Sequence, residues 1–235
     1  MRSTGNSPNT PLAGACLRDA EVWIFDLDNT LYPAASRLFD QVDRNITRFI
    51  CERLDLDWDD AHKIQKSYFR EHGTTMRGMM SNHGTDPDDF LAFVHDIDLA
   101  AVPRDDRLDA ALSRLPGRKI VFTNGSVDHA QRVMEKVGVA EHFETIFDIV
   151  ASEFTPKPEP SVYQQLIDSH AIRPETAVMV EDMARNLEPA AALGMTCVWV
   201  HTENAWGQEG SENDYVHHVT DDLTGWLTDL TALKN

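Results

Sequence analysis

The chain has few cysteines and no long apolar run. Its 235 residues include three cysteines, Cys16, Cys51 and Cys197, which are widely spaced and form no Cys-x-x-Cys pair. This usage argues against a disulfide framework and predicts a reducing, cytoplasmic setting. No stretch of about 18 apolar residues is present, so we expect no segment that crosses a membrane.

Positive charge is scarce. The sequence has 21 lysines and arginines against 39 aspartates and glutamates, which gives a formal net charge of −18. Such an excess repels polyanions and argues against general binding to nucleic acid or to an anionic membrane. Any site for an anion must therefore be made locally positive by a metal ion, a few cations or backbone amides.

Zinc-ligand spacings are also missing. The 10 histidines are scattered, and only His217 and His218 are close in sequence. Neighbouring residues rarely share one metal ion, so we expect these histidines to be solvated on the surface rather than to form a zinc site.

Short apolar runs separated by helical patterns indicate the fold class. Most of the runs are continuous and rich in Val and Ile, which is typical of strands buried on both faces of a parallel sheet. Helices are expected at 127–137, closed by Gly138, around 162–167, and at 184–193, closed by Gly194. This alternation predicts a doubly wound α/β sheet. The expected strands are 21–25, 119–123, 145–151, 176–180 and 196–201.

More than ninety residues separate the first two expected strands, which is too many for a simple crossover. Helices are expected at 38–54, from Asp57 to Gly73, from the N-cap Asp86 onward, and at 105–115. We interpret residues 34–102 as a helical insert over the end of the first strand, where ligands of such sheets bind. The remaining divisions are a Rossmann-like core at 18–33 and 103–235 and a polar leader at 1–17. The leader lacks the apolar segment of a signal peptide and is expected to be disordered.

Two carboxylates follow the first expected strand directly. Asp26 and Asp28 are two residues apart, so alternation along an extended chain would place both side chains on one side. Such a pair needs a cation between the acids or a proton on one of them. It suits Mg²⁺, or a nucleophile beside an acid/base group. An Asx turn followed by a helix cap is the simpler alternative.

Polar residues also follow the second expected strand and the two strands near the C-terminal end. Thr123-Asn124 could hold an anion beside a helix N-terminus, or serve as an ordinary cap. Lys157 lies in a stiff proline-rich loop, which either presents its ammonium to a ligand or leaves it in solvent. Glu181-Asp182, with Asn186 one helical turn later, could form a metal site or an acidic N-cap region. Because parallel strand ends converge on one edge, four independent caps are a poor explanation.

These motifs resemble, in the same order, those of the haloacid dehalogenase-like hydrolases. The resemblance covers about residues 20–230 and rests on Asp26-Leu27-Asp28-Asn29-Thr30, Thr123-Asn124, Lys157 and Glu181-Asp182 with Asn186. It implies a three-layer Rossmann-like core with a helical cap inserted after the first strand, which matches the expected insert.

The resemblance also implies catalytic roles. Asp26 would attack phosphorus and form an aspartyl-phosphate, and Asp28 would protonate the leaving oxygen and then activate water. Lys157 would stabilise the nucleophile and the charge of the transition state. Members that cleave carbon–halogen bonds generally lack an acid at the position of Asp28, so its presence favours phosphate chemistry.

The same resemblance implies a cofactor and its ligands. Mg²⁺ would be held by Asp26, the backbone carbonyl of Asp28, and Asp182. Glu181 and Asn186 would support the metal ligands from behind. The phosphate-binding residues would be Thr123, Asn124 and Lys157.

Shorter stretches resemble the pyrimidine 5′-nucleotidase subfamily. These are 31–33, 68–79 and 219–223, and they suggest Arg77 and Tyr32 as substrate contacts, with Tyr32, Phe69 or Met76 against a base. Arg77 could equally be an ordinary surface arginine. We predict a Mg²⁺-dependent phosphomonoesterase acting on UMP or CMP, whose partner is thus a small phosphorylated metabolite. The alternatives are a phosphatase for phosphoglycolate, a sugar phosphate or pyridoxal phosphate, a phosphoglucomutase-type isomerase, and a non-catalytic binding module.

Overall fold

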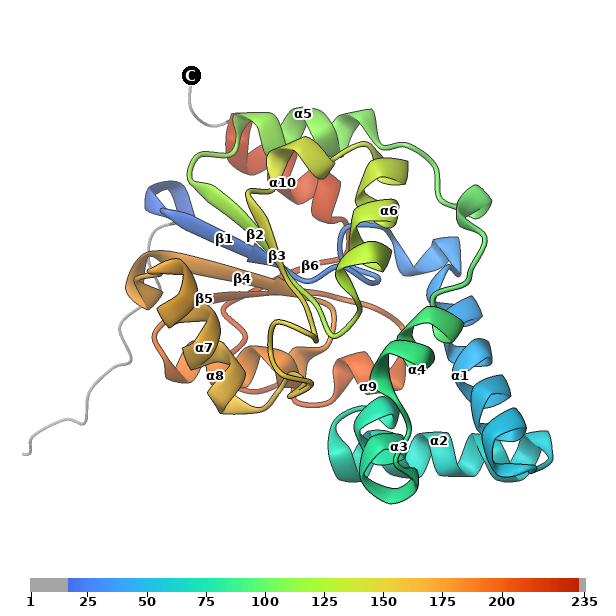
Figure 1. Ribbon diagram of the computed structural model, residues 1–235. Coiled ribbons are helices and arrows are strands. Elements are labelled where there is room, and N and C mark those ends of the chain that lie inside the picture. The colour runs from blue at the N-terminus through green and yellow to red at the C-terminus, as the bar shows by residue number, and fades with distance from the viewer. Residues whose placement is uncertain (1–16, 233–235) are drawn as a thin grey trace, which may run out of the picture.

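A six-stranded parallel sheet lies at the centre of the molecule (Figure 1). The computed structural model describes residues 17–232, and the strand order is β3-β2-β1-β4-β5-β6. The order reverses between β1 and β4, which is the place where open α/β sheets bind ligands. The predicted doubly wound sheet is confirmed. Its strands are β1 (Val22–Phe25), β2 (Arg118–Phe122), β3 (Thr145–Phe147), β4 (Ala177–Glu181), β5 (Thr196–Val200) and β6 (His218–Thr220).

Helices cover both faces of the sheet, which gives three layers (Figure 1). One face carries α5 (Asp106–Arg114), α6 (Val127–Val137) and α10 (Leu223–Ala232), and the other carries α7 (Pro160–His170) and α8 (Glu188–Ala192). Side chains of β1 alternate between the two layers: Trp23 and Phe25 join one buried apolar cluster, and Val22 and Ile24 join the other. Short 3-10 turns occupy Leu17–Asp19, Ala34–Ser36, Leu99–Ala101, Ala140–His142, Pro174–Thr176 and Ala184–Leu187.

Two strand predictions need correction. The third strand ends at Phe147 rather than at residue 151, because the carboxylate of Asp148 accepts from the backbone N–H groups of Val127 and Ala151 and turns the chain. The sixth strand, β6, was not expected, because it is a short, largely exposed edge strand without a buried apolar run. The expected helix at 184–193 is a 3-10 turn followed by α8.

A helical insert separates β1 from α5 and lies beside the core near α9 (Ala205–Gln208; Figure 1). The helices expected from sequence are present, and Asp57 caps α2 by accepting from the backbone N–H of Asp60 at 3.0 Å. Phe49 packs against Phe90 and Phe93, with ring centroids 5.0 and 5.3 Å apart, and forms part of the insert's apolar core. The insert helices are α1 (Phe39–Leu54), α2 (Trp58–His72), α3 (Thr75–His83) and α4 (Pro87–Val94).

The helix α3 was not expected from the sequence. It begins after Thr74, whose hydroxyl accepts from the backbone N–H of Arg77 at 3.2 Å. Its Gly78 packs directly on Tyr68 of α2, where an added Cβ would overlap the ring carbon Cγ. Glycine lowers helix propensity, so the local sequence pattern disfavoured a helix at this place. The close contact with Tyr68 nevertheless leaves room only for glycine.

The expected leader at 1–17 lies outside the described residues except for Leu17, which begins the first 3-10 turn. Among residues 17–232, no helix is both long enough and apolar enough to cross a bilayer.

Candidate active site

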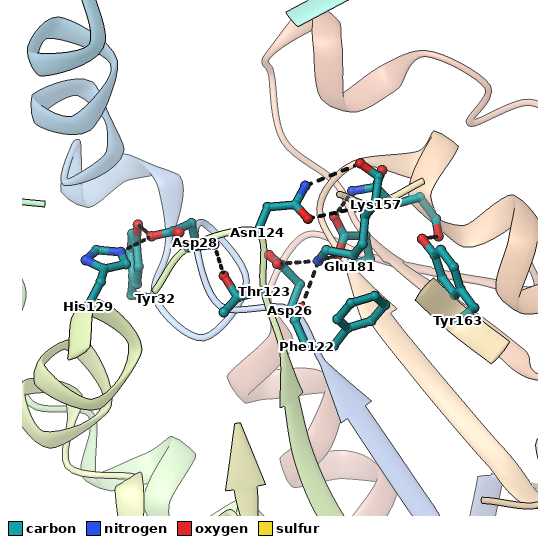
Figure 2. Close-up of polar contacts among 12 residues, drawn as sticks. Asp26, Asp28, Tyr32, Phe122, Thr123, Asn124, His129, Lys157, Tyr163 and Glu181 are labelled. Carbon is teal, nitrogen blue, oxygen red and sulfur yellow. Dashed lines mark hydrogen bonds and ion pairs between the residues drawn. The ribbon is translucent and has the colours of Figure 1, made fainter. Parts of the chain in front are cut away.

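A buried lysine lies between two buried carboxylates at the carboxyl edge of the sheet. Lys157 Nζ lies 2.7 Å from Asp26 Oδ1 and 2.8 Å from Glu181 Oε2, and it donates to the carbonyl oxygen of Phe122 at 2.8 Å (Figure 2). Asp26 follows β1, Glu181 ends β4 and Phe122 ends β2. The three partners of the Lys157 ammonium therefore come from the ends of three neighbouring strands. Two of them, Asp26 and Glu181, belong to motifs that were predicted from the sequence.

Asn124 fixes the backbone of Lys157. The Asn124 side chain accepts from the Lys157 backbone N–H at 2.9 Å and donates to the Lys157 carbonyl at 3.3 Å. Its amide group is therefore engaged by the lysine loop. The phosphate contact expected of Asn124 stays a prediction.

Glu181 is held from its other side by Asn186. The Asn186 amide donates to Glu181 Oε1 at 2.7 Å, and the hydroxyl of Tyr163 donates to the Asn186 carbonyl at 2.6 Å (Figure 2). Tyr163 comes from α7 and was not identified from the sequence, where it belongs to an ordinary apolar helix face. The Glu181 carboxylate thus contacts Lys157 with one oxygen and Asn186 with the other.

The acidic side chains at this edge fit a hard divalent cation. Carboxylate oxygens of Asp26, Glu181 and Asp182 all lie within 4.8 Å of one another, and all three residues are buried. Within the described part of the chain, the Asp182 carboxylate has no hydrogen-bond or ion-pair partner, and the buried Oδ1 of Asn186 has none either. Three acids with a single lysine among them leave an excess of negative charge at this edge. Carboxylate oxygens are also the ligands that Mg²⁺ prefers.

The crowding of acids perturbs their ionisation. Burial and the charge of Glu181 raise the pKa of Asp26 to about 7, although Lys157 acts against them. Burial and the charges of Glu181 and Asp26 hold the pKa of Asp182 well above its ordinary value. Burial lowers the pKa of Lys157, but Asp26 and Glu181 outweigh it and hold this pKa above its usual range. A divalent cation at this edge would favour the charged form of the acids.

Asp28 has partners of its own. The hydroxyl of Tyr32 donates to Asp28 Oδ1 at 2.6 Å, and His129 Nε2 lies 2.9 Å from the same oxygen (Figure 2). Burial raises the pKa of Asp28, but His129 and Tyr32 together hold it below its ordinary value. Because β1 ends at Phe25, strand alternation does not extend to Asp28, and a turn with Asn29 at φ 61° follows it.

Thr123 follows β2 at the same edge. Its hydroxyl oxygen accepts from the backbone N–H of Gly125 at 3.0 Å, and its side chain is buried. The N-terminus of α6 follows directly, capped by Ser126. A hydroxyl group next to a helix N-terminus is an arrangement that can bind an anion, so the predicted phosphate contact of Thr123 stays a prediction.

Two histidines were missed from sequence. His129 and His95 are 1% and 8% exposed, so the expectation of solvated surface histidines is wrong for both. His129 lies four residues before the buried Val133 on α6, which is the signal that could have identified it. Val127, the first residue of the same helix, is by contrast 46% exposed.

The residues predicted to contact the substrate lie in two different places. Arg77 lies where the insert meets the core, with Nη1 3.4 Å from Glu159 Oε1. Tyr32 is buried and its hydroxyl is taken by Asp28. Phe69 of the insert contacts Trp206 of the core edge-on, with ring centroids 5.5 Å apart.

A further cation lies at this junction. The guanidinium of Arg185 lies 4.6 Å from the ring centroid of Phe69. Its buried Nε has no hydrogen-bond partner among the described residues.

The sequence is similar to those of known proteins. The pattern of the haloacid dehalogenase-like hydrolases matches residues 21–194. Phosphate metabolism protein 8 of Saccharomyces cerevisiae is 27% identical over 194 residues, which are 74% of this chain and 60% of the yeast protein. The match therefore spans less than two thirds of that relative.

Solved structures share the fold. One is a mutant of CbbY from Rhodobacter sphaeroides in complex with xylulose-(1,5)bisphosphate, with a TM-score of 0.60 and 18% identity over 87% of this chain and 95% of that one. Another is a HAD phosphatase of Thermococcus onnurineus, with a TM-score of 0.60 and 15% identity over 91% and 97% of the two chains. Since the family pattern covers well over half of the sequence, the chain belongs to the haloacid dehalogenase-like hydrolases.

Proposed function

We propose that the protein is a Mg²⁺-dependent phosphomonoester hydrolase that works through an aspartyl-phosphate on Asp26. The observation that carries this proposal is the Asp26 carboxylate, which Lys157 holds at 2.7 Å beside Glu181 and Asp182, with Asp28 anchored separately. Such a carboxylate can act as a nucleophile. The phosphate-related names of similar proteins agree with this chemistry.

The residues of this edge would bind and orient the phosphate group. Asp26 and Asp182, with the backbone carbonyl of Asp28, would hold Mg²⁺, which supplies positive charge that neutralises and orients the phosphate. Thr123 would donate to a phosphate oxygen. Lys157 would act through its positive charge, because its three N–H groups already contact Asp26, Glu181 and the carbonyl of Phe122. Residues 34–102 would act as a cap that excludes water from the core at 18–33 and 103–235.

In the first step, a carboxylate oxygen of Asp26 attacks phosphorus. The bond from phosphorus to the ester oxygen breaks, and a proton on Asp28 passes to that oxygen, which leaves as an alcohol. Lys157 favours the charged form of Asp26 and aligns the group, because its ammonium contacts Oδ1 and leaves Oδ2 without a hydrogen bond to any described residue.

In the second step, Asp28 takes a proton from water. The resulting hydroxide attacks phosphorus, the bond to Asp26 breaks, and inorganic phosphate leaves. Both carboxyl groups then return to their starting states. The lowered pKa of Asp28 keeps this carboxyl group in the charged form that can accept the proton.

We propose a pyrimidine nucleoside 5′-monophosphate as the substrate. The aromatic pair Phe69–Trp206 at the junction of insert and core would pack against the base, and Arg77 would contact the substrate from α3. The second candidate is a small metabolite with another anionic group. It is favoured by the partly buried Arg185, which forms no ion pair within the described residues.

Phosphate release with Mg²⁺ tests both levels of the proposal. The panel contains UMP, CMP, dUMP, AMP, GMP, phosphoglycolate, pyridoxal phosphate and sugar phosphates, with Asp26→Asn as the matched blank. Preference for UMP and CMP supports the nucleotidase assignment. Preference for a sugar phosphate or phosphoglycolate supports the second candidate. Release from no ester by the wild-type protein rejects the hydrolase proposal and favours a mutase or a binding module.

A further inference from the structure

His129 contacts the carboxylate of Asp28, although it lies outside the sequence motifs. It is the third residue of α6, its side chain is 1% exposed, and its Nε2 lies 2.9 Å from Asp28 Oδ1. The hydroxyl of Tyr32 donates to the same oxygen (Figure 2). The other oxygen of Asp28, Oδ2, accepts no hydrogen bond from any residue between 17 and 232.

We propose that His129 is a positioning residue for the acid/base carboxylate of Asp28, a role that rests on the proposed phosphatase function. Two donors on Oδ1 fix the rotation of the carboxylate and leave Oδ2 for the substrate. An oxygen that already accepts two hydrogen bonds is a poor proton carrier, so the proton travels on Oδ2. It passes from Oδ2 to the leaving oxygen in the first step, and Oδ2 takes a proton from water in the second. His129 exchanges no proton with the substrate.

The ring of His129 is itself held in place. The ring of His95 stacks on it, with centroids 4.2 Å apart and planes 8° from parallel. His95 Nδ1 lies 3.0 Å from the hydroxyl of Ser126, the N-cap of α6. Gly125 lies beside both rings: an added Cβ would make a tight contact of 3.3 Å with His129 Cδ2 and an ordinary one of 3.6 Å with His95 Cε1. Packing thus orients the imidazole toward Asp28.

This support comes from the insert. His95 closes α4, and the guanidinium of Arg132 in α6 donates to the carbonyls of His95 and Ile97, both at 3.2 Å. Burial, with the charge of Arg132 acting in the same direction, lowers the pKa of His95 to about 3, so the stacked ring is uncharged at neutral pH. The last helix of the insert therefore braces the residue that orients Asp28.

Three variants separate positioning from simple packing. His129→Gln keeps an N–H donor, and His129→Phe keeps the volume but has no donor. His142→Phe is the matched control, because His142 Nε2 lies 2.6 Å from Asp109 Oδ1 in a similar pair outside the site. We expect His129→Phe to lower kcat on the preferred ester by about 10- to 100-fold with little change in KM. His129→Gln should recover much of the loss, and His142→Phe should leave kcat unchanged.

The leaving group provides a second readout that a packing defect would not move. A sugar alkoxide needs a proton as it leaves, whereas p-nitrophenolate leaves without one. In rapid-mixing experiments, His129→Phe should slow phosphoenzyme formation from the preferred ester far more than from p-nitrophenyl phosphate. Equal losses on both substrates, or a Gln variant as impaired as the Phe variant, overturn the positioning role.

The failure of this inference is distinguishable from failure of the proposed function. A wild-type protein that hydrolyses no ester rejects the function, and the positioning role with it. An active wild-type enzyme that tolerates His129→Phe rejects the inference alone.

The hydrogen bond between His129 and Asp28 can also be observed directly by NMR. In ¹⁵N-labelled protein the chemical shift of the proton on His129 Nε2 should change in Asp28→Ala, and an unchanged chemical shift overturns the contact.

Discussion

Lys157 Nζ lies 2.7 Å from Asp26 Oδ1, and both side chains are almost fully buried. Removing the ammonium in Lys157→Met would leave the carboxylates of Asp26 and Glu181 in a low-dielectric interior without their cation. We expect a loss of about 3–5 kcal/mol in the free energy of unfolding, measured by chemical denaturation in EDTA. Phosphate release should also be lost.

Two controls sharpen this prediction. Lys63→Met removes an exposed lysine paired with Asp60 and should leave the free energy of unfolding almost unchanged, because solvent screens such a pair. Adding Glu181→Gln to Lys157→Met removes one of the uncompensated charges and should restore part of the stability. A double variant less stable than the single one would contradict the charge argument.

The raised pKa of Asp26 predicts a pH-dependent stability of the metal-free protein. Because the folded state keeps a proton on Asp26 up to about pH 7, this group favours folding at low pH. Its contribution is full below the ordinary pKa of a free aspartate and is lost as the pH rises through 7. The melting temperature in EDTA should therefore fall between pH 5 and 8 more steeply for the wild type than for Asp26→Asn. Parallel curves would show that Asp26 ionises normally.

Magnesium should reverse that trend. A divalent cation binds the charged carboxylates, so it competes with protons for Asp26 and Asp182. We expect Mg²⁺ to raise the melting temperature more at pH 8 than at pH 5.5, and to bind more weakly to Asp182→Asn at both. Calorimetric titration of metal-free protein measures the affinity. Equal affinity in Asp182→Asn would exclude that carboxylate as a ligand.

Asp28→Asn should separate the two chemical steps. The variant cannot carry a proton, so kcat on a nucleotide should fall by about 10²- to 10⁴-fold. With p-nitrophenyl phosphate, whose leaving group needs no proton, we expect a burst of one p-nitrophenolate per enzyme followed by slow turnover. Quench-flow detection of the trapped phosphoenzyme checks this. Steady hydrolysis without a burst would show that another group activates water.

Arg77 provides a test of the substrate assignment. Its ion pair with Glu159 is partly exposed, so Arg77→Ala should change stability by less than about 1 kcal/mol. We expect it to raise KM for UMP by about tenfold, as loss of one hydrogen bond to a charged group predicts. Glu159→Gln is the control that breaks the pair but keeps the arginine. If both variants raise KM equally, Arg77 acts through Glu159 rather than through the substrate.

Gly78 tests the packing inside the insert. An added methyl group in Gly78→Ala would overlap Tyr68, so we expect a loss of about 1–3 kcal/mol despite the better helix propensity of alanine. Ser81→Ala on the exposed face of the same helix should be neutral or slightly stabilising. A stabilised Gly78→Ala protein would show that α2 and α3 are less tightly packed than described.

Local pattern was sufficient for much of this molecule. Continuous apolar runs, the N-caps Asp57 and Asp86, and the closing Gly138 determine strands and helices, because each acts within a few residues. The placement of Asp26 and Glu181 at strand ends also follows from sequence, since parallel strands share one carboxyl edge. The helix α3 escaped prediction because its reason, the contact of Gly78 with Tyr68, is tertiary.

The working arrangement of the site depends on partners far apart in the chain. Lys157 meets Asp26 across 131 residues, and His129 meets Asp28 across 101. The sequence by itself determined which chemical groups reach the edge of the sheet. Only the tertiary structure decided that the Asn124 side chain contacts the Lys157 backbone and that a buried histidine contacts Asp28. The physical reason is that hydrogen-bond partners are chosen by packing in three dimensions, which leaves no periodic signal along the chain.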